Sequence, residues 1–388
     1  MKYIYLDNAA TTPINPQVRE VMLPYLNEKY GNPSSFHSVG KEVKDDLDTA
    51  RENIGKILNV RPDEILFTSG GTESDNLAIL GFARMNKKHG NHIITTMIEH
   101  HAVLEAVTFL EKKEGFEVTY LETDRDGLVT VEQVQNAIRP ETILVSIMYA
   151  NNEIGTIQPI AEIAKIIKTK NPKIIFHTDA VQAANYLDCD VQKLGVDMLT
   201  LSGHKIYGPK GVALLYIKKG AAINPIMFGG HQEGGTRPGT ENVAAIAGFG
   251  AAIAELAISK SQNIKIRVQR LRDKLIDDIL TKIPGASLNG SLGARLPNNA
   301  NISFDRVEGE SILMALDQEG IAVSTGSACA SGSLAPSYVL MALGMTHQRA
   351  HGSIRFSLSK YTTEAEINYV LKILPKVIER LRKLSPLK

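Results

Sequence analysis

The chain has 388 residues, of which 43% are hydrophobic and 22% charged. This balance is that of an ordinary globular protein, and it excludes disordered, collagen-like and low-complexity classes. The 43 basic and 42 acidic side chains leave a formal net charge of +1. Composition therefore gives no support for a nucleic acid as the partner.

The N-terminus reaches Asp7 before a signal-peptide apolar core could form. The longest run of small apolar residues, 243–254, is shorter than the ~20 residues that cross a bilayer. Two cysteines, Cys189 and Cys329, cannot form a disulfide framework and indicate a reducing compartment. We therefore expect a soluble cytoplasmic protein without membrane contact.

Seven apolar runs between residues 60 and 217 predict β-strands, because they are rich in Ile, Val, Leu and Thr. The predicted strands are 64–67, 92–96, 117–121, 142–147, 173–178, 198–201 and 212–217. Amphipathic segments that predict helices lie between them, at 74–87, 102–113 and 160–170. This alternation predicts an α/β fold with a mostly parallel seven-stranded sheet wrapped by helices, and ligands at the carboxyl ends of the strands.

The pattern changes after Asn242. Residues 243–283 predict helix with a break near 259–263, and a mixed α/β region follows. The last helix has a capping box, Thr363 with Glu366, and Pro375 should kink it. We divide the chain into a large α/β domain, residues 14–257, and a smaller α/β domain, residues 1–13 and 258–388. The first dozen residues are expected to join the two.

A polar, glycine-containing segment, residues 68–75, lies between the first predicted strand and the first predicted helix. Gly70 and Gly71 let the backbone turn closely, and Thr72 is expected to cap the helix with Asp75 three residues on. Amides at a helix start make a phosphate cradle, although neither a P-loop nor a dinucleotide fingerprint is present. An ordinary strand–helix turn is the alternative.

An acid and an amine follow two neighbouring predicted strands, Asp179 after 173–178 and Lys205 after 198–201. Adjacent strand ends would place both at the ligand-binding edge of the sheet. A partly desolvated lysine is a Schiff-base candidate, and a nearby carboxylate can keep a pyridinium nitrogen protonated. A structural ion pair between the two is the alternative.

Two histidines, His100 and His101, follow the predicted strand 92–96. A histidine at a strand end can stack on a flat cofactor and move protons near neutral pH. No Cys/His spacing completes a zinc site. A helix-capping or surface role is the alternative for one of the two.

Cys329 lies in a run of Gly, Ser and Ala, residues 325–333, without apolar periodicity. Such a run predicts a mobile tether, which suits a thiol nucleophile that must travel to a second site; a tolerated loop cysteine is the alternative. Cys189 stands between carboxylates that raise its thiol pKa, so we expect it to be inert.

Asn152 offers amide hydrogen bonds, and Arg355, in a strand-like context, could bind a carboxylate or form a surface salt bridge.

Together these segments resemble pyridoxal-phosphate enzymes of the class V aminotransferase group, specifically cysteine desulfurases of the NifS/IscS type, whose fold is PLP fold type I. The resemblance covers nearly the whole chain, and the lysine motif with the Ser-Ala-Cys loop is its most specific part. It is carried by residues 5–13, 31–35, 68–75, 151–155, 202–208, 237–240, 326–330 and 353–358.

The resemblance implies a role for each matching residue. Lys205 would bind the cofactor and later move the Cα proton, Asp179 would pair with the pyridine nitrogen, Gln182 would contact the phenolic oxygen, and His100 would stack on the ring. The residues implied for the phosphate are Gly71, Thr72, Ser202 and His204. Thr240 would come from the second subunit, which implies a homodimer.

The resemblance also implies the reaction. Asn152, which also contacts the cofactor, and Arg355 would orient L-cysteine, and Cys329 would take its sulfur as a persulfide while alanine leaves. An acceptor protein such as an iron–sulfur scaffold would receive the sulfur. His231 and Gly234 depart from common family patterns, and they lie in what the resemblance implies is the dimer-facing phosphate region. The alternatives are a class V aminotransferase, a selenocysteine lyase, and a cofactor-bearing scaffold protein.

Overall fold

The computed structural model describes residues 3–261, 263–326 and 335–385. Its largest sheet has seven strands in the order β2-β8-β7-β6-β5-β3-β4. These strands are β2 (Ile65–Thr68), β3 (His92–Thr96), β4 (Glu117–Leu121), β5 (Thr142–Ser146), β6 (Ile175–Asp179), β7 (Met198–Ser202) and β8 (Ala213–Ile217). Within this described sheet β8 alone runs antiparallel to its neighbours, so the prediction of a mostly parallel sheet is confirmed.

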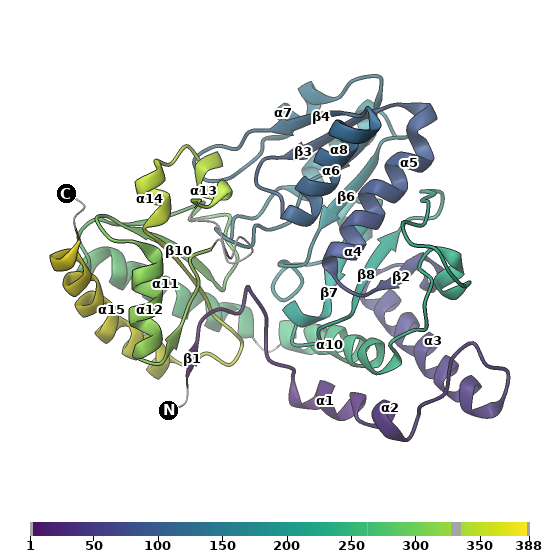
Figure 1. Cartoon of the computed structure of the whole chain (residues 1–388), viewed down its shortest axis with the longest axis horizontal. Coiled ribbons are helices and arrows are strands. Elements are labelled where there is room, and N and C mark those ends of the chain that lie inside the picture. The colour runs from purple at the N-terminus through teal and green to yellow at the C-terminus, as the bar shows by residue number, and fades with distance from the viewer. Residues whose placement is uncertain (1–2, 262, 327–334, 386–388) are drawn as a thin grey trace.

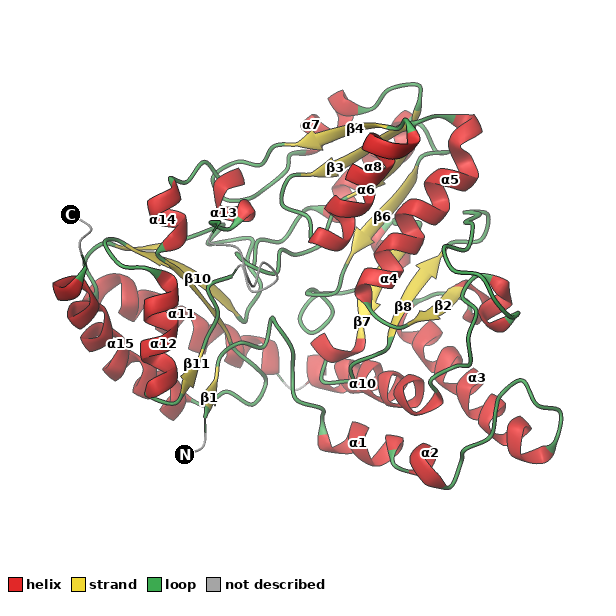
Figure 2. Ribbon diagram, in the orientation of Figure 1, coloured by secondary structure: helices red, strands yellow, loops and turns green. Residues whose placement is uncertain are grey.

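Helices cover both faces of this sheet (Figures 1 and 2). Consecutive strand residues point to opposite faces, and Ile93 and Ile94 accordingly belong to two different apolar cores. One core also contains buried residues of α3 (Ser38–Leu58), α8 (Ile160–Lys170) and α10 (Val243–Ser261). The other contains buried residues of α6 (His101–Glu114) and of the helical segment 71–86.

The helical segment after β2 differs from its prediction. It begins at Gly71 and consists of α4 (Gly71–Asn76), a π-helical turn η2 (Leu77–Gly81) and α5 (Phe82–Asn86). The expected cap by Thr72 is wrong, because Gly70 is the N-cap residue. The Glu73 carboxylate reaches back to the turn before the helix and accepts a hydrogen bond from the Ser69 amide at 2.7 Å, which leaves the first amides of α4 without a side-chain cap.

A second, smaller sheet forms in the C-terminal part of the chain. It is antiparallel, in the order β12-β10-β9, and a parallel pair β1-β11 lies in the same region. The antiparallel sheet consists of β9 (Ala286–Leu288), β10 (Asn299–Phe304) and β12 (Ser353–Ser357), and the parallel pair consists of β1 (Ile4–Tyr5) and β11 (Ile321–Ala322). The helices that share the apolar core of this region are α11 (Ile264–Lys282), α12 (Gly309–Gln318) and α15 (Glu364–Leu384).

Two expectations for the C-terminal part are confirmed. The long helical stretch is interrupted between Ser261 and Ile264, where Asn263 has a left-handed φ of 57°. The Thr363–Glu366 capping box is present at the start of α15. Pro375 lies inside that helix, and its kink and the domain boundary after residue 257 stay predictions.

Shorter elements complete the described chain. They are α1 (Pro16–Met22), α2 (Pro24–Asn27), η1 (Pro62–Glu64), η3 (Lys87–His89), α7 (Val131–Ala137), α9 (Val191–Leu194), η4 (Gly203–Lys205), η5 (Gln232–Gly235), α13 (Tyr338–Ala342) and α14 (His347–His351). None of the helices in the described ranges is long and apolar enough to cross a membrane.

The N-terminal segment, residues 6–12, connects the two sheets and runs between them in Figure 1. The Leu6 carbonyl accepts a hydrogen bond from the amide of Ser357 in β12 at 2.7 Å. Further along, the Thr12 amide donates to the carbonyl of His204, directly after β7, at 2.9 Å. The segment therefore crosses the carboxyl-end edge of the large sheet, where α/β proteins bind ligands.

Candidate active site

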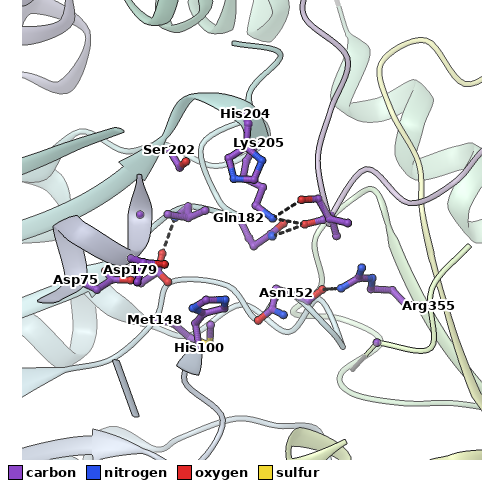
Figure 3. A pocket seen from close by; sticks show the side chains of 16 residues that line it. Asp75, His100, Met148, Asn152, Asp179, Gln182, Ser202, His204, Lys205 and Arg355 are labelled. Carbon is purple, nitrogen blue, oxygen red and sulfur yellow. Dashed lines mark hydrogen bonds between the residues drawn. The ribbon is translucent and has the colours of Figure 1, made fainter. Parts of the chain in front are cut away.

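A cavity of about 440 Å³ lies at this edge, within the usual size range of small-molecule sites. Side chains from strand ends, helix starts and the N-terminal segment point into it (Figure 3). All the predicted site residues except Thr240 and Cys329 line it: Gly71, Thr72, His100, Asn152, Asp179, Gln182, Ser202, His204, Lys205 and Arg355. The sequence-based grouping of these residues into one pocket is therefore reproduced in space.

Lys205 and Asp179 reach the cavity from adjacent strands, as predicted. Asp179 is the last residue of β6 and pairs in register with Thr200 of β7, and Lys205 ends the single turn η4 after β7. The Lys205 Nζ donates hydrogen bonds to the carbonyl oxygens of Ala9 at 2.6 Å and Ala10 at 2.9 Å (Figure 3). The N-terminal segment thus contributes acceptors for the amine.

Asp179 has a buried carboxyl group, and burial raises its pKa. Three neighbours oppose this rise: the His100 ring when it is protonated, the Val181 amide, which donates a 2.8 Å hydrogen bond to Oδ1, and the Lys205 amine. These contacts favour the ionised form. Asp179 is therefore the carboxyl group in the cavity that is best placed to carry a negative charge toward a ligand cation.

Asp75 is a second buried carboxyl group in the cavity wall, where the sequence pattern indicated only a capping partner. Burial first, and the charge of Asp179 second, raise the pKa of Asp75 well above its ordinary value. Two neighbouring carboxyl groups in a dry site cannot both ionise readily. Asp75 has fewer compensating contacts, so it is the neutral partner of the pair.

His100 has the capping role that was the alternative for one of the two histidines. It is the N-cap of α6, and its Nδ1 accepts a hydrogen bond from the Ala102 amide at 3.1 Å. Burial lowers the pKa of His100, so the ring facing the cavity is neutral near pH 7. His101 points elsewhere, against the Tyr338 ring at 4.6 Å between centroids. No cluster of candidate metal ligands occurs in the described ranges.

One end of the cavity has the donors that a phosphate group requires. The Ser202 Oγ is buried and has no hydrogen-bond partner among the described residues. A Cβ placed on Gly70 would meet nothing within 4 Å, so space is open beside the amides at the start of α4. His204 adds a ring whose pKa burial and the nearby Lys205 lower to about 4. A phosphate would supply acceptors to the orphaned hydroxyl and the amides, so these residues fit that group.

The opposite end of the cavity contains Arg355, in β12. Its guanidinium is only 3% exposed, donates from Nη1 to the Asn152 carbonyl oxygen at 3.0 Å, and pairs through Nη2 with Asp7 at 2.8 Å. The predicted alternative, a salt bridge, is thus present, but it is buried rather than on the surface. Gln182 completes this wall, since its Nε2 donates to the Ala9 carbonyl at 3.0 Å.

Two predicted residues are not in this cavity. Cys329 lies outside the described residues, although Gly326, shortly before it, lines the cavity. Thr240 is exposed and does not line the cavity of its own chain. Cys189, which we expected to be inert, is buried.

Sequence reasoning also missed buried carboxyl groups behind the cavity. Glu99 accepts hydrogen bonds from Thr96 Oγ1 at 2.7 Å and from the Met148 amide at 2.9 Å, and burial raises its pKa to about 8. Burial likewise raises the pKa of Glu153 to about 7. Glu99 precedes the predicted site residue His100 in the sequence, and Glu153 follows Asn152. Their positions next to predicted site residues could have indicated both carboxyl groups.

Comparisons with known proteins agree with this geometry. The sequence model of the class-V aminotransferase family matches residues 4–370. A cysteine desulfurase IscS from Clostridium botulinum is 53% identical over 388 residues, which cover 100% of this chain and 97% of that protein. A cysteine desulfurase IscS from Dictyoglomus turgidum is 54% identical over 385 residues, covering 99% and 97%.

A solved structure agrees as well. A NifS-like protein superposes with a TM-score of 0.92 at 40% identity, covering 98% of this chain and 100% of that one. The match therefore extends over both sheets and the segment that joins them. The chain belongs to the class-V aminotransferase family and, within it, to the cysteine desulfurases of the NifS/IscS type.

Proposed function

We propose that this chain removes sulfur from L-cysteine and releases L-alanine, with pyridoxal 5'-phosphate in the 440 Å³ cavity and Cys329 as the residue that receives the sulfur. Enzymes of this family depend on that cofactor in general. The observation that carries the proposal is the convergence of a lysine amine, a buried carboxyl group and an orphaned hydroxyl on one cavity. These groups are Lys205, Asp179 and Ser202.

Each part of the cofactor has a matching group in the cavity. Asp179 would face the ring nitrogen, Gln182 the phenolic oxygen, His100 the ring, and Lys205 the aldehyde carbon. The residues proposed for the phosphate are Gly71, Thr72, Ser202 and His204. When bound, the cofactor withdraws electrons from the substrate's α-carbon.

The chain's own residues would then position the substrate and move its protons. Arg355 would bind the α-carboxylate through its guanidinium, with Asn152 beside it. The Lys205 amine would take the proton from the α-carbon and later return one. The Cys329 thiolate would attack the substrate sulfur: a sulfur–sulfur bond forms, the carbon–sulfur bond breaks, and the carbon side gains a proton to leave as alanine.

The alternatives predict different behaviour. A class V aminotransferase has no need for a thiol at position 329, and the relatives reported above are named cysteine desulfurases. A selenocysteine lyase would prefer selenocysteine over L-cysteine when the two compete. A cofactor-bearing scaffold protein would show the cofactor's visible absorption band but release no alanine from L-cysteine, whereas a cofactor-free module would lack a band that borohydride bleaches.

We also propose that the active form is a homodimer in which Thr240 enters the partner's cavity. Large apolar side chains remain exposed on the single chain, as expected of a surface that a second copy covers. They include Leu26, Tyr30, Phe36 and Phe228. Inactive Lys205→Ala and Thr240→Ala chains, unfolded and refolded together, should form mixed dimers with one complete site and recover about a quarter of the wild-type sites. No recovery would contradict the shared site.

The destination of the sulfur is a further part of the proposal. A cytoplasmic acceptor protein such as an iron–sulfur scaffold would receive it, as the name of the IscS relatives suggests. Purified candidate acceptors mixed with the sulfur-loaded enzyme should gain the sulfur, which mass spectrometry can follow.

Mass spectrometry after incubation with L-cysteine tests the central step. We expect one added sulfur on the peptide that contains Cys329, and alanine in solution. The Cys329→Ala variant should keep the cofactor's absorption but release no alanine. The matched control is Cys189→Ala, which changes the buried cysteine outside the cavity and should release alanine normally. Normal alanine release by Cys329→Ala would refute the proposal.

A further inference from the structure

Asp7 is a charged residue that the proposed chemistry does not use. Its Oδ1 accepts a hydrogen bond from Nη2 of Arg355 at 2.8 Å. The Asp7 side chain is 20% exposed and that of Arg355 is 3% exposed. Water therefore screens this pair little, and a charge-assisted hydrogen bond in such a place holds its donor firmly.

The backbone fixes the position of Asp7 beside β12. Asp7 pairs with Ser357 in a parallel bridge, and the Asn8 amide donates to the Ser357 carbonyl at 3.2 Å. The Asn8 side chain donates to the same carbonyl at 2.9 Å. Arg355 lies two residues before Ser357, so its side chain is on the same face of the strand. The ion pair thus follows from strand register and not from two flexible side chains meeting by chance.

Arg355 keeps donors for a ligand after these contacts. Nη2 bonds Asp7, Nη1 bonds the Asn152 carbonyl at 3.0 Å, and Nε is buried without an acceptor among the described residues. A guanidinium has five N–H donors in a rigid plane, so it can bind a further carboxylate when that plane is held. Arg355 lines the cavity, and Figure 3 shows it beside Asn152 at the end away from Ser202.

We propose that Asp7 is a positioning residue for the substrate's α-carboxylate. By holding Nη2, it fixes the plane of the Arg355 guanidinium and directs the remaining donors at that carboxylate. The inference rests on the proposed function, in which Arg355 binds this group. Without Asp7, the guanidinium keeps only its hydrogen bond to the Asn152 carbonyl and can rotate about it. Ligands that carry a carboxylate therefore bind more weakly.

Two variants of the loaded enzyme test this role. Asp7→Ala removes the acceptor, and we expect KM for L-cysteine to rise about tenfold with kcat changed less than about twofold, since one charge-assisted contact is weakened. Asp7→Asn keeps an oxygen acceptor without the charge, so its KM should fall between those of the wild type and Asp7→Ala. Thermal unfolding of each variant shows that it is folded.

Ligand binding separates positioning from a general structural effect. L-alanine and ethylamine differ only in the α-carboxylate, and the binding of each is followed through the cofactor's absorption. Asp7→Ala should weaken the binding of L-alanine about tenfold and leave the binding of ethylamine unchanged. Tyr5→Phe is the matched control, because it removes a 3.0 Å hydrogen bond to the Thr11 carbonyl in the same segment and leaves the ion pair in place. It should bind both ligands as the wild type does.

The outcomes are distinguishable. The positioning role alone is overturned if Asp7→Ala weakens the binding of L-alanine and ethylamine equally, or changes neither. This conclusion requires a wild type that binds L-alanine and forms it from L-cysteine. A wild type that neither binds L-alanine nor forms it overturns the proposed function together with this inference.

Discussion

The Nζ of Lys205 lies 2.6 Å from the carbonyl oxygen of Ala9, a residue 196 positions earlier in the chain. Gln182 donates to the same carbonyl at 3.0 Å. A backbone group of the N-terminal segment therefore holds two side chains that we assign to the cofactor.

Replacement of Lys205 by Ala should abolish covalent capture of the cofactor. Borohydride should then fix no cofactor to the protein, and alanine formation should fall by at least about a thousandfold, because both the attachment point and the proton carrier are lost. Lys210→Ala is the control, because Lys210 is exposed and does not line the cavity. Cofactor that remains covalently fixed in Lys205→Ala would contradict the assignment.

The two carboxyl groups Asp75 and Asp179 should respond differently to the same change. Asp179→Asn should lower kcat/KM by about a hundredfold or more, because it removes a charge that the ring nitrogen requires. Asp75→Asn should lower it by no more than about threefold, because burial and Asp179 raise the pKa of Asp75 and an amide resembles the neutral acid. Steady-state kinetics at pH 7.5 measure kcat/KM for both variants and for the wild type. Equal losses in both variants would refute the division of charge.

Ser202→Ala should weaken cofactor binding. The buried Oγ has no partner in the described chain, so we expect it to donate to the phosphate, and its loss should raise the Kd for pyridoxal phosphate about tenfold. Equilibrium dialysis of the cofactor-stripped enzyme measures this. Ser287→Ala is the control, since that hydroxyl accepts a hydrogen bond from Arg349 outside the cavity. An unchanged Kd in Ser202→Ala would contradict the assignment of Ser202 to the phosphate site.

Glu99 should make the protein less stable as pH rises. Its pKa is about 8 in the folded protein, against 4.5 for an ordinary glutamate, so between these values the folded state holds a proton that the unfolded chain has released. Raising the pH through this window therefore lowers the free energy of unfolding, by about 1.4 kcal/mol for each pH unit. Glu99→Gln removes this contribution, because an amide does not titrate.

Urea denaturation at pH 6 and pH 8 measures the effect. The wild type should lose more stability between the two pH values than Glu99→Gln does, and the exposed Glu52→Gln control should follow the wild type. Parallel pH profiles for wild type and Glu99→Gln would show that Glu99 is ionised in the folded protein.

Local patterns predicted most of the fold. Strands 92–96 and 117–121 match their predicted limits, because both contain β-branched residues, although 92–96 is buried throughout and 117–121 is a partly exposed edge strand. The start of the helix after β2 was misplaced, since α4 begins at Gly71 and its N-cap residue, Gly70, has no side chain that could cap it. Capping side chains are the sequence signal for a helix start, and Gly70 provides none.

The positions of Asp179 and Lys205 at the cavity could be predicted, because they follow from the places of these residues at strand ends. Sequence reasoning missed Asp7 and the carboxyl role of Asp75, because each acts through a residue far away in the chain. The contact between Asp7 and Arg355 joins residues 348 positions apart and depends on the register of the bridge to Ser357. Periodicity and motif spacing carry no information on such a register.

The N-terminal segment gives the protein a late step in its biogenesis. Ala9 leaves the ribosome early, but the strand partner that holds this segment, Ser357, is translated near the end. The large sheet can pack while synthesis continues, since its strands end at Ile217. The contacts of Ala9 and Ala10 to Lys205 can form once that sheet has packed, but the pairing of Asp7 with Ser357 must wait until almost the entire polypeptide has emerged.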